Sequence, residues 1–333
     1  PARDEARVQR LRCLRTPSQP SLAAPPCCVK KRRGVVAALT GTYKSGTDIS
    51  SCTTVTIGCS VPAGVTLDLS HHRVHGHHHL RHRQMGWPIG ASHWKQPYRQ
   101  RLRRPVFFRM NKVLSSTVSG FTLKNMPYRT FSILSSQKTT ISGLTLDASA
   151  GDDLAKNTDG FDLSGNDYVT IKGNKIYNQD DCLAMQSSTN TVFSNNYCSG
   201  GHGISIGSLG GSTVTSSAVS GLTVSGNSIV NSVNGIRIKT IGLKGLVSNV
   251  KYSKVKNAIV LHSDYSRSKG GYTAPPSEVT IEDITVSGLS GTATNLYDIV
   301  VNSKVVSDWS FSGITVSASK TGTCSGQPSS VDC

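Results

Sequence analysis

The sequence predicts an all-β protein folded as a right-handed parallel β-helix, a solenoid of stacked coils of roughly 20–30 residues. Three observations predict this fold. Short segments rich in Val, Ile and Thr recur at intervals of that length, each segment runs into an Asn or Gly turn, and no helical segment of ten residues separates them. A βαβ architecture is disfavoured because no helical crossover joins the strands. Each coil must then bury its inward side chains against the next coil.

The recurring segment alternates apolar residues with Thr or Ser and closes on Gly, Asn or Asp. Copies lie at residues 118–125, 141–147, 169–176, 222–229, 279–286 and 309–316, with a weaker copy at 192–197. Earlier in the chain, residues 53–58 and 65–69 also alternate as strands do. We therefore predict one β-helix domain over residues 41–333.

Two segments depart from this pattern. Residues 1–33 carry nine Lys/Arg and two acids, and residues 71–106 carry eight Lys/Arg, no acid and eight of the ten histidines. We expect residues 1–40 to be an atypical, poorly ordered basic segment and residues 71–106 to be an anomalous basic, His-rich segment without strand or helix period. The histidines of 71–106 could bind metal, or the tract could derive from a shifted reading frame or a wrong splice. The N-terminal coils and the cap of the β-helix are expected in these two segments. Their unusual sequence is therefore a concern for the stability of the fold.

The formal net charge of +17 therefore has a local origin. Outside residues 1–33 and 71–106 the net charge is only +2, so the body of the protein lacks the broad basic surface of a nucleic-acid-binding protein. No window of about 18 apolar residues predicts a membrane span. Residues 1–20 lack the apolar region of a secretory signal. We therefore expect either that the signal was removed or that this N-terminus is not the native one.

The nine cysteines suit an oxidising compartment, so we expect a secreted, extracellular protein. Cys182 and Cys198 flank one strand-length unit, and Cys324 and Cys333 could close the C-terminal tail. The pairing of the others cannot be read from the sequence: Cys13, Cys27, Cys28, Cys52 and Cys59.

Three acids and a histidine recur at the interval of one coil. Asp159 precedes Asp180 by 21 residues, and His202 follows Asp181 by another 21. Stacked coils place equivalent positions in register, so these side chains are expected to converge on one outer face. Arg237 and Lys239 follow further on. They alternate with isoleucines on a predicted strand, so both are expected to point outward.

Such a group can perform acid/base hydrolysis of an anionic polymer. Carboxylates in one cleft repel one another, which raises the pKa of at least one and keeps it protonated near the working pH. That acid can protonate a glycosidic oxygen while the others activate water. The arginine and the lysine can bind a substrate carboxylate. Taken singly, each motif is typical of a solvated turn or strand, and only their joint occurrence in coil register favours a catalytic site.

Four motifs resemble those of the polygalacturonases, the β-helical pectin hydrolases, and especially the fungal endo-acting members. They are Asn-Thr-Asp-Gly at 157–160, Gln-Asp-Asp-Cys at 179–182, Gly-Gly-His-Gly at 200–203 and Arg-Ile-Lys at 237–239. The resemblance implies hydrolysis of α-1,4 links in polygalacturonate or pectin, with inversion and without metal or cofactor. It also implies a protein that acts on this polysaccharide as a monomer, without nucleic acid or membrane as partner.

The resemblance also implies roles for individual residues. Asp180 would be the general acid, Asp159 and Asp181 would hold and activate the water, and His202 would maintain the protonation of the acids. Arg237 and Lys239 would bind galacturonate carboxylate, and Tyr297 would stack on the substrate. The pairs Cys182–Cys198 and Cys324–Cys333 resemble disulfides of the family. One family cysteine pair is missing, because Val305 and Val306 precede Ser307-Asp308-Trp309 where a cysteine is expected.

Three other functions remain open at this stage. One is a related hydrolase acting on rhamnogalacturonan or xylogalacturonan. Another is a Ca²⁺-dependent pectate lyase. The third is a catalytically impaired β-helix that binds polyanions through its basic tracts.

Overall fold

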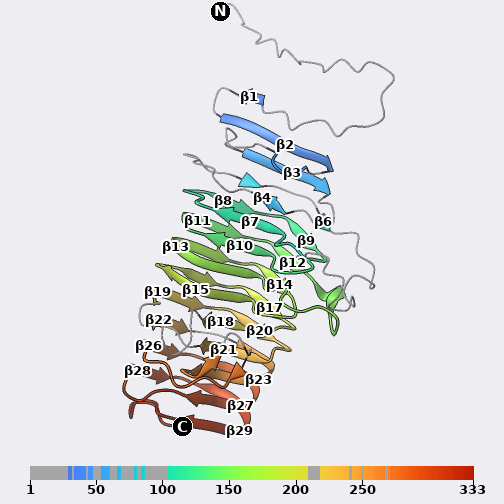
Figure 1. The fold of residues 1–333 in the computed structure, drawn as a ribbon. Helices are drawn as coiled ribbons and strands as arrows, with labels where there is room; N and C mark the ends of the chain where they lie inside the picture. The colour runs from blue at the N-terminus through green and yellow to red at the C-terminus, as the bar shows by residue number, and fades with distance from the viewer. Residues whose placement is uncertain are drawn as a thin grey trace, which may run out of the picture.

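The protein is a right-handed parallel β-helix, as predicted, in which the coils stack into one elongated column (Figure 1). The structure is a computed structural model. It describes residues 29–31, 34–42, 44–47, 54–60, 66–68, 79–80, 84–86, 104–208, 218–239, 242–248, 251–266, 269 and 271–333. Among these residues, no helix is long and apolar enough to cross a membrane.

Nearly all described elements are strands, and most belong to one sheet. Three N-terminal strands form a separate sheet: β1 (Val29–Lys31), β2 (Gly34–Thr42) and β3 (Thr54–Ser60). The large sheet begins with β4 (Leu67–Asp68), β5 (His79–Leu80), β6 (Gln84–Gly86), β7 (Phe108–Asn111), β8 (Thr117–Ser119), β9 (Thr122–Lys124), β10 (Phe131–Leu134), β11 (Gln137–Ser142) and β12 (Thr145–Asp147). A 3₁₀ turn, η2 (Ser149–Gly151), precedes the next coil.

The central and C-terminal coils continue the same sheet. They contain β13 (Phe161–Lys172), β14 (Lys175–Tyr177), β15 (Leu183–Thr189), β16 (Val192–Ser194), β17 (Tyr197–Ser199), β18 (Ile204–Gly207), β19 (Ala218–Ser225), β20 (Ser228–Val230), β21 (Asn234–Lys239), β22 (Gly242–Ser248), β23 (Lys251–His262), β26 (Ile281–Ser287), β27 (Ser290–Val300), β28 (Val306–Ser312) and β29 (Thr315–Ser325). A small antiparallel hairpin, β24 (Tyr265–Ser266) with β25 (Gly271–Tyr272), projects from the stack.

Parallel pairing in register explains how the sequence repeat becomes a core. Equivalent apolar residues of successive coils are partners and point inward, as the row Phe108, Phe131, Phe161, Leu183, Ile204, Ile236 and Ile259 illustrates. The phenylalanine rings of this row stack at centroid separations of 4.7 and 5.1 Å. Each residue of the row is at most 1% exposed. Burial of such a row is the main favourable term that holds adjacent coils together.

Buried asparagines form a second internal row at the turns. Asn174 Nδ2 donates to Asn196 Oδ1 at 2.9 Å, and Asn196 Nδ2 donates to Asn227 Oδ1 at 3.1 Å. The same side-chain oxygens accept from backbone N–H groups of the preceding coil, as in the bond from Asn174 N to Asn196 Oδ1 at 3.0 Å. These amides satisfy backbone groups that the turn would otherwise leave buried without partners.

Parts of the two basic segments lie in strands. Residues 29–31 and 34–42 form strands, so the boundary placed at residue 40 cuts through β2. Within 71–106, β5 and β6 pair in parallel with β8 and β9 and so continue the coil, although no strand period was evident there. Most of 1–40 and of 71–106 lies outside the described residues.

Both predicted disulfides are formed: Cys182 with Cys198 and Cys324 with Cys333, at Cα separations of 5.9 and 6.3 Å. The first pair ties β17 to the residue just before β15, beside Asp180 and Asp181. Cys13, Cys27, Cys28 and Cys52 lie outside the described residues, and of Cys59 only the backbone in β3 is described.

Candidate active site

The predicted acids and histidine come together on one face because they occupy matching positions in successive coils. Asp159 lies two residues before Phe161, Asp181 two before Leu183, and His202 two before Ile204, and these three core residues are register partners. Backbone bonds from Gly160 N to Asp181 O (2.9 Å) and from Cys182 N to Gly203 O (2.8 Å) extend the register through the turns.

Glycines around His202 permit this close stacking. A Cβ atom added to Gly201 would collide with the carbonyl oxygen of Asp180. One added to Gly203, which has a φ of +80°, would collide with Asn234 O. Side chains at either position would therefore push His202 away from the carboxylates.

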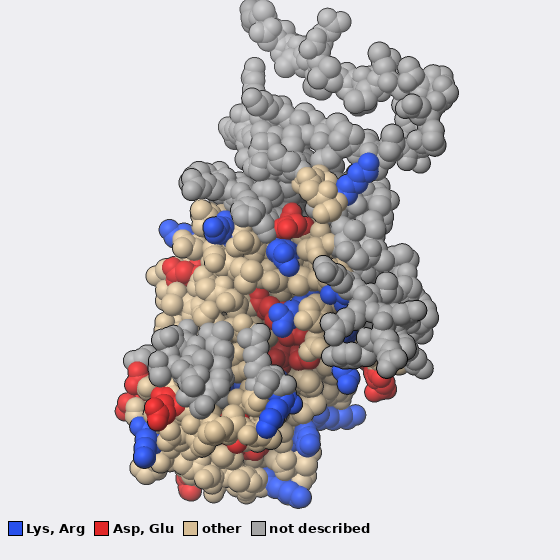
Figure 2. Space-filling model, in the orientation of Figure 1, with Lys and Arg blue, Asp and Glu red and all other residues tan. Residues whose placement is uncertain are grey.

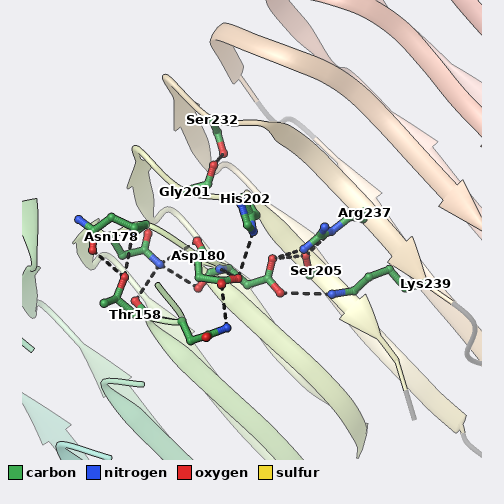
Figure 3. A network of polar contacts seen from close by, with 12 residues as sticks. Thr158, Asn178, Asp180, Gly201, His202, Ser205, Ser232, Arg237 and Lys239 are labelled. Atoms are coloured by element: carbon green, nitrogen blue, oxygen red, sulfur yellow. Dashed lines mark hydrogen bonds and ion pairs between the residues drawn. The ribbon is translucent and has the colours of Figure 1, made fainter. Parts of the chain in front are cut away.

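Asp181 is held as an ionised carboxylate. Arg237 Nη2 donates to its Oδ1 at 2.6 Å and Lys239 Nζ to its Oδ2 at 3.3 Å, while Ser205 Oγ also donates to Oδ1 (Figure 3). Arg237 Nε in turn donates to Ser205 Oγ at 3.0 Å. Burial alone would raise the pKa of Asp181, but Lys239, Arg237 and Ser205 together hold it below its usual range.

Asp180 has other partners and a more open setting. Asn157 Nδ2 donates to its Oδ2 at 3.2 Å, the backbone N–H of Asp181 donates to its Oδ1 at 2.9 Å, and His202 Nδ1 lies 3.1 Å from the same Oδ1. The side chain of Asp180 is 16% exposed against 6% for Asp181. Asp180 is therefore the carboxyl that a ligand reaches first.

Asp159 and Asp162 form a second pair of acids. Burial, together with the carboxylates of Asp162, Asp180 and Asp181, raises the pKa of Asp159 to about 9. Burial raises the pKa of Asp162 to about 7, although Arg129 opposes the shift from 3.6 Å. Asp159 Oδ1 and Asp162 Oδ2 are buried and have no hydrogen-bond partner. The sequence reasoning missed Asp162, which lies two residues beyond the Asn-Thr-Asp-Gly motif and points outward from β13.

The structure places Tyr297 apart from the other predicted site residues. Tyr297 pairs with Ile259 and so continues the inward core row; it is 7% exposed and packs near Phe311. Two other tyrosines lie at the site, both on the β24–β25 hairpin. Tyr272 stacks on His262, and Tyr265 has its ring centroid 5.1 Å from Lys239 Nζ. The signal that could have found Tyr265 is its position three residues beyond the outward-facing His262, which pairs with Lys239.

A pocket of about 710 Å³ opens beside Asp180. Its lining comprises Asp152, Asp153, Ala155, Lys156, Asn157, Gln179, Asp180, Gly200 and His202. Figure 2 shows acidic side chains gathered in a hollow near the middle of this face, with basic side chains around them. The acids therefore face a depression large enough for part of a carbohydrate chain.

Asp180, Asp181 and His202 also have the composition of a metal site, with donor atoms within 4.8 Å of one another. Their surroundings do not fit a divalent cation. Both oxygens of Asp181 already accept from the cationic groups of Arg237 and Lys239, which would repel a metal ion at that carboxylate. The arrangement favours acid/base chemistry by the side chains themselves.

Comparison with known proteins defines the class. The profile of the family described as "Glycosyl hydrolases family 28" matches residues 35–333, and the chain belongs to this family. The relatives include endopolygalacturonase B of Aspergillus niger, 35% identical over 326 residues that cover 85% of this chain and 88% of the relative. Probable endopolygalacturonase B of Aspergillus kawachii is 40% identical over 243 residues, which cover 69% of this chain and 66% of the relative.

Solved structures share the fold. The endo-xylogalacturonan hydrolase of Aspergillus tubingensis aligns with a TM-score of 0.71 at 24% identity and covers 89% of each chain. Endopolygalacturonase I of Stereum purpureum, solved with two galacturonates, aligns with a TM-score of 0.60 at 26% identity and covers 85% of this chain and 99% of that one. The chain is thus a pectin-hydrolase-type β-helix of family 28.

Proposed function

We propose that this protein is an endo-polygalacturonase that hydrolyses α-1,4-galacturonosyl links in polygalacturonate, with inversion at the anomeric carbon. The observation that carries the proposal is the network in which an accessible carboxyl, Asp180, lies beside an ionised one, Asp181, held by Arg237 and Lys239. The names of the relatives from Aspergillus support the same substrate.

The geometry supports separate roles for the two neighbouring acids. Asp180 faces the pocket and would give its proton to the glycosidic oxygen as the bond to the anomeric carbon breaks. Asp181 is ionised and would accept a proton from the water whose oxygen bonds to that carbon. Each turnover thus moves one proton onto the leaving sugar and takes one from water, and Asp180 must regain its proton before the next.

Asp159 would act on the water, and His202 would act on the protonation state of Asp180. Because the pKa of Asp159 is raised to about 9, Asp159 would hold the water by hydrogen bonding rather than accept its proton. His202 Nδ1 contacts Asp180 Oδ1 and would supply the route by which Asp180 is protonated again.

Arg237, Lys239 and Tyr265 would bind a sugar next to the scissile bond. Arg237 donates from Nε to Ser205 and from Nη2 to Asp181, and a substrate carboxylate can accept from its remaining N–H groups. Tyr265 provides an aromatic wall beside Lys239. Since the two disulfides persist in oxidising surroundings, we also propose an extracellular protein that acts on its polysaccharide as a monomer.

The test is an assay of reducing ends released from polygalacturonate, with the anomeric form of the new end followed by NMR. The wild-type protein is expected to release inverted ends in the presence of EDTA, and Asp180→Asn to lose this activity by at least about a hundredfold. Lys175→Gln, an exposed substitution on β14, serves as the control variant. Unsaturated products that absorb in the ultraviolet, or a dependence on Ca²⁺, would contradict the proposal.

A further inference from the structure

Two guanidinium groups lie against one aromatic ring at the edge of the site. Cζ of Arg104 is 5.5 Å from the centroid of Tyr128, and Cζ of Arg129 is 5.4 Å from the same centroid. The ring attracts each cation, but the two cations repel one another. A tyrosine flanked in this way, half-buried beside an exposed arginine, is electrostatically suited to an anion.

Backbone carbonyls fix Arg104 in this position. Its Nη1 donates to Lys156 O at 3.1 Å and to Pro127 O at 3.4 Å. Lys156 is itself exposed and lines the pocket beside Asp180. The next residue, Asn157, donates to Asp180 Oδ2. The cationic group is thus tied to the same loop that contacts the proposed acid.

Arg129 occupies the catalytic row itself. It lies two residues before Phe131, the partner of Phe161, and so stands one coil before Asp159 in the column of site residues. Its Nε is 3.6 Å from Asp162 Oδ1 and has no hydrogen-bond partner, although it is buried. A third of the side chain remains exposed, at 33%. Arg129 therefore has hydrogen-bonding capacity left for a ligand.

The two basic groups stand at opposite ends of the acids. The coils enter the site in the order of β10, β13, β15, β18 and β21, with Arg129 just before the first strand and Arg237 on the last. Four steps between coils, at about 4.8 Å each, separate these positions by roughly 19 Å. That span is longer than one sugar ring.

We propose that Arg104, Tyr128 and Arg129 form a second subsite, which binds the carboxylate of a galacturonate unit on the side of the acids opposite Arg237 and Lys239. The inference rests on the proposed function for the identity of the polymer. A chain bound at both subsites crosses the acids and is cleaved internally. The subsite therefore confers a preference for long chains.

The test compares the wild-type protein with Arg104→Gln, Arg104→Lys and the control Lys175→Gln. The ratio of kcat/KM for long over short oligogalacturonates is expected to fall about tenfold in Arg104→Gln, mainly through KM, because one charged hydrogen-bonded contact is lost. Arg104→Lys should keep part of the ratio, and Lys175→Gln all of it. With methyl-esterified long oligomers, the wild type and Arg104→Gln should differ little. Equal thermal midpoints would show that all variants fold.

An unchanged ratio in a folded Arg104→Gln would overturn the subsite while leaving the hydrolase proposal intact. If the wild-type protein cleaves no galacturonan, the proposed function fails instead, and the subsite is then tested by calorimetric binding of a long oligogalacturonate. Weaker binding by Arg104→Gln than by Lys175→Gln upholds the subsite, and equal binding overturns it.

Discussion

Neutralising Asp159 should change how the stability of the protein depends on pH. Its carboxyl pKa is raised from 3.8 to about 9, so the folded state keeps a proton that the unfolded chain releases above pH ~4. Stability must then fall as pH rises from about 4 toward 9, by up to about 1.4 kcal/mol per pH unit. Asp162, with a pKa of about 7, adds to the fall at lower pH. Between pH 7 and pH 9, deprotonation of Asp159 alone should lower the free energy of unfolding by about 2 kcal/mol.

Chemical denaturation of wild type and Asp159→Asn at a series of pH values measures this effect. Between pH 7 and 9 the free energy of unfolding should decline in the wild type and stay nearly level in the variant, since Asn cannot titrate. Asp308→Asn provides the control, because Asp308 is exposed and its φ of +57° is one that Asn adopts readily. Parallel curves for wild type and Asp159→Asn would refute the reasoning that a buried proton resides on Asp159.

Three further outcomes are expected. Asn196→Leu should destabilise the fold by about 3 kcal/mol in denaturant melts, since it orphans several buried groups, whereas the exposed neighbour Asn195, changed to Gly, should have little effect. Arg237→Lys should lower kcat/KM on polygalacturonate about tenfold or more, because the Nε bond to Ser205 and the planar fork are lost. His262→Gln should raise KM more than it lowers kcat, because His262 bridges Asp264 and Asp298 at the base of the hairpin that carries the site tyrosines.

The stacking of coils could be predicted from sequence because one residue pattern repeats through the chain. The 21-residue interval predicted Asp159 in register with Asp180, and Asp181 in register with His202. In the structure the first step is 22 residues long, so the residue in register with Asp159 is Asp181, which His202 then follows. Asp180 lies beside them, hydrogen-bonded to the N–H of Asp181. What the spacing could not supply was the depth of each carboxyl in the cleft, which decides which one keeps a proton.

The inward position of Tyr297 was not evident from the sequence. Tyr297 lies in a strand where inward and outward residues alternate, and a shift of one position reverses the face. Tyr265 lies on an irregular hairpin that no repeat reveals. The contact between Arg129 and Asp162 was not predicted. The two residues are 33 apart in the sequence, and they become neighbours only when coils of unequal length are aligned.

The row of buried asparagines restricts how this protein can change in length. Each amide bonds to the equivalent amide one coil away, so a single inserted residue inside a coil would break the match on both sides. A whole extra coil, or a longer loop between strands, would leave every one of these amide hydrogen bonds intact. Changes in substrate preference during evolution should therefore come from loop insertions at the rim of the cleft, or from gain and loss of complete turns.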